Sequence, residues 1–302
     1  MIWVDGKILP DDGLAINAAD RTFEHGLGLF ETLRTWGGRP ALLDRHRARM
    51  LRSAEELRLP IDPASLPDAE AVRAFLEAEG AGEDRLLRIT ASGGTESGKS
   101  IVWMRSAPLP GPLGGEAGAS VLVDAWKVAL DDPMARHKSL NYWPRRLAYE
   151  EARRQGCDET LSRPTDGRAG GGYFEGSRTN LFTIRGGGSG LVGKSPAILN
   201  TTSPRSPIVP GIMRGEVLKV AGDLAEGSDQ EIPIIDDLED ILLDEADEVF
   251  LTNSVRGIIP VARAVDARTG KERHRWPSPG PWTQRLQDLL AERLRPDRGE
   301  TP

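Results

Sequence analysis

The chain of 302 residues contains little cysteine, little lysine and no long apolar run. Its single cysteine, Cys157, excludes a disulfide framework and any metal site built from several cysteines. No unbroken apolar run exceeds four residues, as at Ile101–Met104, whereas a membrane-spanning helix needs roughly 20. The first ten residues also lack the basic-then-apolar order of a secretory signal. We therefore expect a cytoplasmic protein that does not enter a membrane.

Charge and histidine content narrow the possible partners further. The 46 acidic and 39 basic residues give a formal net charge of −7, which argues against nucleic acid as the main partner. The four histidines are scattered, with no pair at metal-binding spacing, so no metal site is predicted. Few lysines are available for a chemical role, namely Lys7, Lys99, Lys127, Lys138, Lys194, Lys219 and Lys271.

The pattern of helix and strand signals predicts an α+β (mixed α/β) chain of two domains. Residues 109–118 are dense in proline and glycine, a composition typical of a linker. This linker separates a smaller N-terminal α/β domain, residues 1–108, from a larger C-terminal α/β domain, residues 119–302. In the first domain, Asp44 is placed to cap a helix over Arg45–Leu59.

One pair of motifs suggests a different class of enzyme. Residues 188–195 match the G-x-x-x-x-G-K-[ST] pattern of a P-loop, and Asp244–Asp247 spell a helicase-type acidic box. A P-loop must open directly into a helix whose N-terminal amides face the phosphates, whereas Pro196 follows at once here. We therefore expect a hairpin tip at residues 186–190 and an amphipathic helix at residues 236–243, which leaves a P-loop NTPase as a remote alternative.

Six short segments stand out by their residue types and their order. They are Arg21–Arg34, His46–Ala54, Lys138–Tyr142, Phe174–Phe182, Pro210–Arg214, and Glu248–Ser254 followed by Pro260-Val261. In this order they resemble the segments of the class IV, fold-type IV enzymes that use pyridoxal 5′-phosphate (PLP). That family includes branched-chain aminotransferases, D-amino-acid aminotransferases and aminodeoxychorismate lyases. The resemblance implies a two-domain, D-amino-acid aminotransferase-like fold.

The resemblance also implies which residues would carry the chemistry of the cofactor. PLP needs a lysine amine for its Schiff base and an acid at its ring nitrogen. Lys138 matches the catalytic lysine, which also moves the proton, and Glu175 matches the acid. The cations of Arg145 and Arg146, close by in sequence, would favour the free amine of Lys138. Asn180 is expected to support the turn that carries Glu175.

The phosphate of the cofactor would be held by several segments together. Arg49 matches a family arginine on the first long helix, and Ser254 matches a hydroxyl that contacts the phosphate. Ile212 and Met213 match a pair whose backbone amides face the phosphate at the start of a helix, a favourable place for an anion. Tyr142 matches a residue that reaches the phenolic oxygen of the cofactor.

Substrate residues and the reaction are less closely defined by the resemblance. Phe30 and Thr32 lie on the strand that faces the substrate in the family, and Arg88 is a candidate for binding a carboxylate. We favour an aminotransferase that moves an amino group between a branched-chain-like amino acid and a 2-oxo acid such as 2-oxoglutarate. The alternative, which Thr32 favours, is an aminodeoxychorismate lyase that releases pyruvate and 4-aminobenzoate in folate synthesis.

The resemblance also implies an assembly, because family members build their site at a dimer interface. We therefore expect a homodimer whose partners are small amino and oxo acids. A protein that binds PLP without catalysis is disfavoured by the presence of both Lys138 and Glu175, and a purely structural interaction protein has no positive feature in the sequence.

Overall fold

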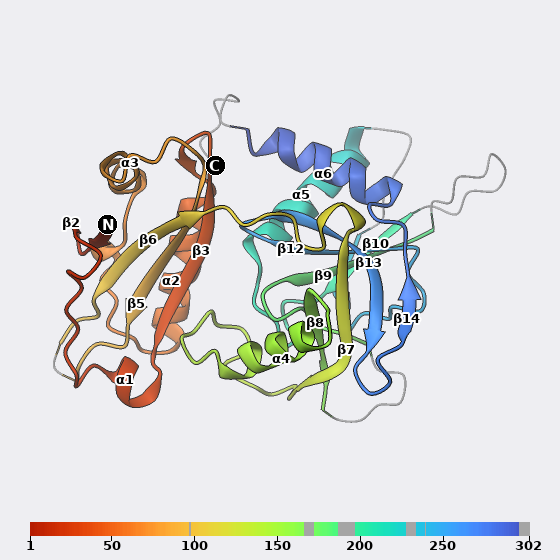
Figure 1. Cartoon of the computed structure of the whole chain (residues 1–302), viewed down its shortest axis with the longest axis horizontal. Helices are drawn as coiled ribbons and strands as arrows, with labels where there is room; N and C mark the ends of the chain where they lie inside the picture. Colours follow the sequence, from red (N-terminus) through yellow and green to blue (C-terminus); the bar gives the residue numbers. More distant parts are fainter. Residues whose placement is uncertain (97, 166–171, 187–196, 228–233, 239, 296–302) are drawn as a thin grey trace. The chain divides into compact units, whose positions relative to one another are not determined.

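The computed structural model describes residues 1–96, 98–165, 172–186, 197–227, 234–238 and 240–295 (Figure 1). Contacts divide the chain into two compact units. Unit 1 contains Met1–Pro110, His137–Tyr142 and the end of the described chain from Leu294, and unit 2 contains Gly111–Arg136 and Trp143–Arg293. The sequence analysis assigned Lys138 to the C-terminal domain because of its position along the chain. In the structure, the contacts of His137–Tyr142 assign this segment to unit 1.

Unit 1 is built on an antiparallel sheet, whose described strands have the order β2-β1-β6-β5-β3-β4. They are β1 (Ile2–Val4), β2 (Lys7–Leu9), β3 (Gly28–Trp36), β4 (Arg39–Pro40), β5 (Arg85–Ser92) and β6 (Val102–Pro108). Side chains alternate between the two faces of a strand. On β3 this alternation separates Leu29, Glu31 and Leu33 from Phe30 and Thr32, so one strand serves the core with one face and the candidate site with the other.

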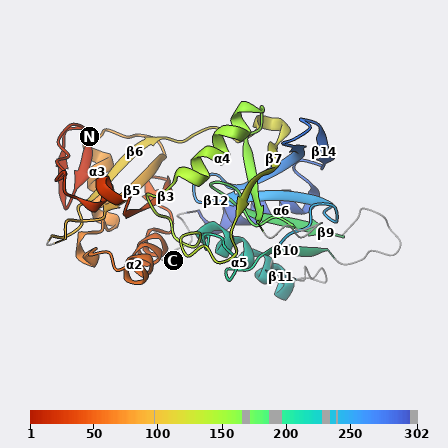
Figure 2. The same ribbon diagram turned by 90° about the horizontal axis from the view of Figure 1, so that it is seen from below.

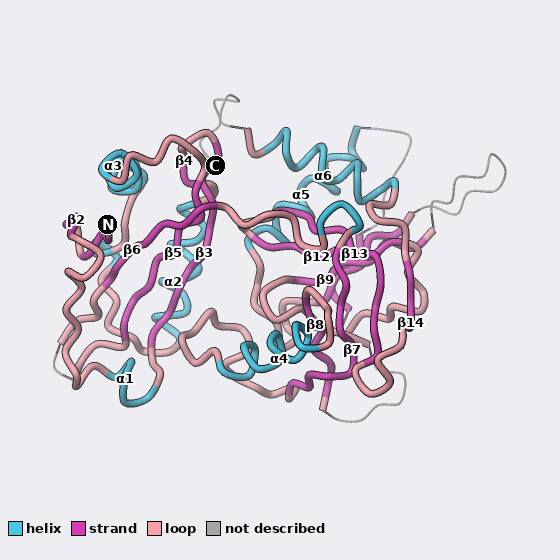
Figure 3. Tube along the Cα trace, in the orientation of Figure 1, coloured by secondary structure: helices cyan, strands magenta, loops and turns pink. Residues whose placement is uncertain are grey.

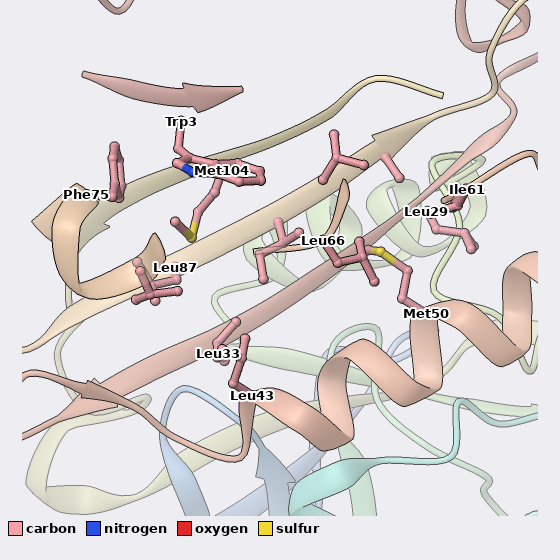
Figure 4. Packing of buried hydrophobic residues seen from close by; sticks show 14 of the residues in the cluster. Trp3, Leu29, Leu33, Leu43, Met50, Ile61, Leu66, Phe75, Leu87 and Met104 are labelled. Carbon is pink, nitrogen blue, oxygen red and sulfur yellow. The ribbon is translucent and has the colours of Figure 1, made fainter. Parts of the chain in front are cut away.

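Three helices belong to the described part of unit 1, and the two longer ones contribute side chains to its buried core. They are α1 (Arg21–His25), α2 (Leu43–Glu56) and α3 (Ala69–Ala78), with a 3₁₀ turn at Pro63–Ser65. Leu43 and Met50 of α2 pack with Leu33 of β3 and with Phe75 of α3 in one buried cluster (Figure 4). Burial of these side chains holds α2 against β3.

The predicted cap of α2 is wrong by two residues. The N-cap is Leu42, in the left-handed conformation with φ 55°, and no side chain caps the helix. Only two residues form β4 before the chain must turn into α2, and the left-handed residue makes that sharp turn. Asp44 consequently lies in the first turn of the helix, where its charge still favours the positive end of the helix dipole.

Unit 2 is built on a larger, mixed sheet with the described order β11-β10-β9-β12-β13-β7-β8, and β14 pairs with β13. Its strands are β7 (Ala119–Val128), β8 (Glu159–Pro164), β9 (Asn180–Arg185), β10 (Ile198–Thr202), β11 (Ile234–Leu238), β12 (Glu248–Asn253), β13 (Gly257–Asp266) and β14 (Glu272–Arg275). β9 pairs antiparallel with β12, with Asn180 opposite Thr252. This register brings the turn before β9 next to the turn after β12.

Three helices and a 3₁₀ turn at Gly115–Ala117 complete the described part of unit 2. The helices are α4 (Trp143–Arg154), α5 (Ile212–Gly227) and α6 (Pro281–Arg293). α4 packs against β7 and β8, whereas α5 and α6 pack against each other and against β12 and β13 (Figure 2). The described part of unit 2 thus combines three helices with a sheet of parallel and antiparallel pairs (Figure 3). The fold is α+β, as predicted.

The structure corrects one part of the sequence analysis around the P-loop-like motif. Residues 236–243 do not form the expected helix, because β11 pairs with β10 and Ile241 bridges to Tyr173. β9 and β10 are antiparallel neighbours with Arg185 opposite Ile198, whereas the expected hairpin tip from residue 187 onward and the motif at 188–195 lie outside the described residues. β10 follows the motif as a strand, which is not the helix that a P-loop requires.

A search of the described residues for a helix long and apolar enough to cross a membrane finds none.

Candidate active site

Lys138 is held beside the start of β3. The amide of Phe30 donates to the carbonyl of Lys138 at 2.9 Å, and the amide of Leu140 donates to the carbonyl of Gly28 at 2.9 Å. Gly28 has a φ of 139°, and a Cβ there would lie 2.6 Å from Leu140 Cδ1. Only glycine therefore permits this close approach, which fixes the backbone on both sides of Lys138.

Four of the residues predicted for the site gather around one aromatic ring in unit 1. The Nζ of Lys138 lies 4.5 Å from the centroid of the Phe30 ring, and the guanidinium carbon of Arg88 lies 3.8 Å from it. The Tyr142 ring packs edge-on against Phe30, with a centroid distance of 5.3 Å. Thr32 shares this face of β3 and lies opposite Arg88 on β5. An amine, a phenol and a guanidinium thus lie around the apolar ring of Phe30 on this face of β3.

Arg49 lies in a buried ionic network behind this face. Its Nε donates to Glu31 Oε1 at 2.8 Å and its NH2 group donates to Glu31 Oε2 at 2.5 Å. The Nδ1 of His46 lies 2.7 Å from Glu31 Oε2. Glu31 is 2% exposed and His46 is fully buried, so the network is shielded from water. This two-point contact fixes the plane of the Arg49 guanidinium.

The charges of this network follow from its burial. Burial would raise the pKa of Glu31, but the charge of Arg49 and the hydrogen bonds of both partners hold it at about 2. Burial lowers the pKa of His46, and the charges of Arg49 and Lys138 lower it further. The charge and hydrogen bond of Glu31 raise it but do not outweigh these effects. We therefore assign a neutral His46 that donates its Nδ1 proton to an ionised Glu31. Among the described residues, the Nε2 atom of His46 has no hydrogen-bond partner.

The Glu31→Gln variant is expected to lower the free energy of unfolding at neutral pH by about 3–5 kcal/mol, because it leaves a buried guanidinium without its counter-charge. The unfolded carboxyl has a pKa of 4.5 and the folded one about 2, so the contribution of Glu31 is complete above pH 4.5 and is lost as the pH falls toward 2. Chemical denaturation between pH 7 and pH 3 measures both effects.

The matched control for this variant is Glu77→Gln, which removes an exposed partner of Arg73 on α3. It is expected to change stability by less than about 1 kcal/mol. Equal losses in the two variants, or an acid dependence that Glu31→Gln leaves unchanged, would show that the buried network does not stabilise unit 1.

Glu175 is the buried acid of unit 2, with 2% of its surface exposed. The NH2 group of Arg145 donates to its Oε1 at 2.6 Å, and Asn180 Nδ2 donates to its Oε2 at 3.0 Å. The amide of Val209 also donates to the carboxylate, at 3.1 and 3.2 Å. The carboxylate is therefore charge-compensated and fixed in orientation. Asn180 supports Glu175 as predicted.

The start of α5 is tied to the same place. Asn180 Nδ2 also donates to the Val209 carbonyl at 2.9 Å, and a Cβ on Gly211 would lie 1.8 Å from Asn180 Oδ1. Glycine is thus required immediately before the helix. The amides of Ile212 and Met213 belong to the first turn of α5, where no helical carbonyl precedes them as a partner.

Ser254 lies in the turn that follows β12. The side chain of Asn253 holds this turn, because its Oδ1 accepts from the amides of Val255 at 3.0 Å and Arg256 at 2.8 Å. The turn lies beside the start of β9, since Thr252 pairs with Asn180. Asn180 therefore joins three of the predicted elements of unit 2, namely the Glu175 turn, the start of α5 and the Ser254 turn.

Two of the cations expected to act on Lys138, Arg145 and Arg146, form ion pairs within unit 2. Arg145 pairs with Glu175, and Arg146 pairs with Glu150 on α4. Each arginine thus has a carboxylate of its own. Sequence reasoning had linked both to Lys138 by proximity along the chain, and this proximity did not reveal their partners.

Comparisons with known proteins show the family to which this chain belongs. Residues 28–264 match the model of the family described as amino-transferase class IV. This chain belongs to the class IV aminotransferase family. Enzymes of the family depend in general on PLP.

The relatives of this class IV aminotransferase include both branches considered above. The branched-chain-amino-acid aminotransferase of Escherichia coli K12 is 26% identical over 309 residues, covering 96% of this chain and 91% of that protein. A branched-chain aminotransferase structure from Thermoproteus uzoniensis is 25% identical with a TM-score of 0.76, covering 96% and 93% of the two chains. The 4-amino-4-deoxychorismate lyase structure from Pseudomonas aeruginosa is 29% identical with a TM-score of 0.75, covering 97% and 99%.

The structure gives Glu31 and His46 a place in the candidate site of this class IV aminotransferase, and it gives Arg145 a partner that sequence reasoning had not predicted. Glu31 fixes Arg49, and its signal was a carboxylate at a core position of β3 between Leu29 and Leu33. His46 completes that network, one helical turn before Arg49. Arg145 compensates Glu175, and no pattern in the sequence marked that long-range pair.

Proposed function

We propose that this protein is a PLP-dependent aminotransferase that moves an amino group between a branched-chain-like amino acid and a 2-oxo acid such as 2-oxoglutarate. The donor becomes the corresponding 2-oxo acid and the acceptor becomes the corresponding amino acid, so the exchange is balanced. One observation carries the proposal: Glu175 is a buried carboxylate held in one orientation by Arg145 and Asn180. An ionised acid in such a place is costly, and such groups are common at functional sites.

The described residues of unit 2 fit one end of the cofactor. Glu175 offers a fixed carboxylate to a protonated ring nitrogen, with which it would form a charge-assisted hydrogen bond. The amides of Ile212 and Met213 and the hydroxyl of Ser254 offer donors for a phosphate. When bound, PLP supplies an electron sink for the negative charge that develops on the substrate.

The residues of unit 1 that match the family's motifs would carry the reacting amine and contacts with the cofactor. The amine of Lys138 would bind the cofactor covalently, and it would then take the proton from the substrate Cα and deliver it to C4′ of the cofactor. Its backbone is held by a hydrogen bond to β3, and its amine lies 4.5 Å from the centroid of the Phe30 ring. Tyr142 would donate to the phenolic oxygen of the cofactor, and Arg49, oriented by Glu31, would add a positive charge for the phosphate.

The substrate would lie on the face of β3 that carries Phe30 and Thr32. Phe30 offers an apolar surface to an aliphatic side chain, which agrees with a branched-chain-like donor. Arg88 offers a cation to a carboxylate of the substrate. Partial burial and the charge of Arg105 lower the pKa of its guanidinium, although a guanidinium in a protein stays protonated at neutral pH.

A second candidate function is the release of pyruvate from aminodeoxychorismate to give 4-aminobenzoate. It is favoured by Thr32, whose hydroxyl lies on the substrate face opposite Arg88, and by the 29% identity to the Pseudomonas aeruginosa lyase. Both reactions would use Lys138 and Glu175 in the same roles. They differ in the bond that breaks after the proton is removed.

The decisive assay uses both substrates with the same PLP-loaded protein. Leucine with 2-oxoglutarate is expected to yield glutamate, whereas aminodeoxychorismate is expected to yield little 4-aminobenzoate. Formation of 4-aminobenzoate without glutamate would replace the proposed function by the lyase reaction. A protein that takes up no PLP would contradict both.

The assembly expected for this protein is a homodimer. Sedimentation equilibrium should give a mass near twice the 32.8 kDa of one chain. A mass of one chain at micromolar concentration would contradict this expectation.

A further inference from the structure

Two arginines in unit 2 come together on neighbouring turns. Arg178 lies on the turn between Glu175 and β9, and Arg256 lies on the turn between β12 and β13. The pairing of Asn180 with Thr252 brings these turns side by side. Each arginine is therefore only a few residues from a candidate cofactor residue, Glu175 in one case and Ser254 in the other.

The surroundings of Arg178 are partly aromatic and partly acidic. Its guanidinium carbon lies 3.8 Å from the centroid of the Tyr149 ring on α4, and its Nε lies 3.8 Å from Glu159 Oε2. The guanidinium of Arg178 thus makes a cation–π contact with Tyr149 and a longer-range ion pair with Glu159.

Glu159 only partly balances the positive charge at this place. Its Oε1 accepts from the amides of Thr160 at 3.0 Å and Ser177 at 3.1 Å, and from the Ser177 hydroxyl. Its Oε2 is buried and has no hydrogen-bond partner among the described residues. The carboxylate of Glu159, which already accepts the hydrogen bonds that hold the turn, is thus the single acid acting on both Arg178 and Arg256 among the interactions described.

Arg256 forms a hydrogen bond through its Nε atom. Its Nε donates to the carbonyl of Gly111 at 3.0 Å. Within the described part of the chain, its NH1 and NH2 groups donate no hydrogen bond. Burial and the neighbouring charge of Arg178 lower the pKa of this guanidinium, so the two cations repel each other in a half-buried place. An anion between them would relieve that repulsion and accept the remaining donors.

We infer that Arg178 and Arg256 form a subsite for the second carboxylate of the dicarboxylic substrate, which 2-oxoglutarate and glutamate carry and a branched-chain amino acid lacks. This inference rests on the proposed function, because it takes the Glu175 and Ser254 turns as the cofactor site. Glutamate, 2-oxoglutarate and aminodeoxychorismate all carry two carboxylates, so the subsite applies to either candidate reaction. The two guanidinium groups are specificity-determining residues, which bind a part of the substrate remote from the reacting Cα.

The test measures binding of two unreactive acids to the PLP-loaded protein by titration calorimetry. Glutarate is the dicarboxylate and hexanoate is the monocarboxylate. In Arg178→Gln and in Arg256→Gln, glutarate is expected to bind about tenfold more weakly or worse, which is the order of a lost charge-assisted pair, while hexanoate binding changes little. In turnover, the KM for 2-oxoglutarate should rise in both variants, with a smaller effect on kcat.

Arg185→Gln is the matched control, because Arg185 lies at the opposite end of β9 and pairs with the exposed Glu245. It should leave both affinities unchanged. Equal weakening of glutarate and hexanoate, or no weakening of either, would overturn the inference. A loss of PLP affinity with glutarate binding retained would assign the two arginines to the cofactor phosphate and would also overturn it.

The same titrations separate this inference from the proposed function. If the protein takes up no PLP and transfers no amino group, the proposed function fails, whatever the arginine variants do. If PLP is bound and amino transfer proceeds, but the preference for glutarate is the same in wild type and variants, only the inference fails. Unfolding temperatures of the variants within a few degrees of the wild type show that their folds are retained.

Discussion

The Lys138→Ala variant is expected to lower kcat for amino transfer from leucine to 2-oxoglutarate by about 10⁴-fold or more. Lys138 is assigned both the covalent attachment of the cofactor and the transfer of the substrate proton, and each contributes a large factor. Its backbone is held to β3 by hydrogen bonds that do not involve its side chain, so the truncation leaves the local fold in place. Stopped-flow absorbance of the half-reaction with leucine measures the loss directly.

Lys127→Ala provides the control for this variant, because Lys127 lies on β7 and has no assigned role. It should retain the activity and the visible absorption of the wild type. An active Lys138→Ala protein, or equal losses in the two variants, would show that the reaction uses another base.

The Glu175→Gln variant is expected to lower kcat by about 10²-fold or more, because a neutral amide holds a protonated ring nitrogen less well than a carboxylate does. The variant also leaves the guanidinium of Arg145 without its partner at 2.6 Å. The free energy of unfolding should therefore fall together with the rate. Steady-state kinetics with saturating PLP, combined with chemical denaturation, separates the two effects.

Glu175→Asp tests whether charge or shape matters at this position. It keeps the carboxylate and should retain more activity than Glu175→Gln, although the shorter side chain weakens its contacts with Asn180 and Val209. The exposed Glu245→Gln variant, which removes the partner of Arg185, should change neither activity nor stability appreciably. Full activity in Glu175→Gln would contradict the role assigned to this acid.

Much of the fold followed from local patterns that the structure preserves. The helix expected over Arg45–Leu59 forms as α2, Leu43–Glu56, and the chain on either side of residues 186–190 forms the antiparallel pair of β9 and β10. Residues 236–243 were misassigned because their periodicity is helical whereas their partners are not local. Ile234 and Ile235 pair with β10, and such a tertiary pairing overrides local preference.

The sequence predicted the individual residues of the candidate site but not the ion pairs that join them to distant residues. The six ordered segments identified Lys138, Glu175 and Arg49, because those residues recur in a recognisable order. The ion-pair partners of Arg49 and Glu175 lie in distant parts of the sequence. Glu31 reaches Arg49 from β3 and Arg145 reaches Glu175 from α4, over sequence separations of 18 and 30 residues. Pairing at such separations depends on the packing of whole elements, which single-sequence patterns do not encode.

The most direct measurement of the central claim is the identity of the lysine that binds the cofactor. The protein is incubated with PLP, reduced with borohydride to fix the bond, digested, and analysed by mass spectrometry. The pyridoxyl group is predicted on Lys138 alone among the seven lysines of the chain. A label on another lysine, or none at all, would contradict the account.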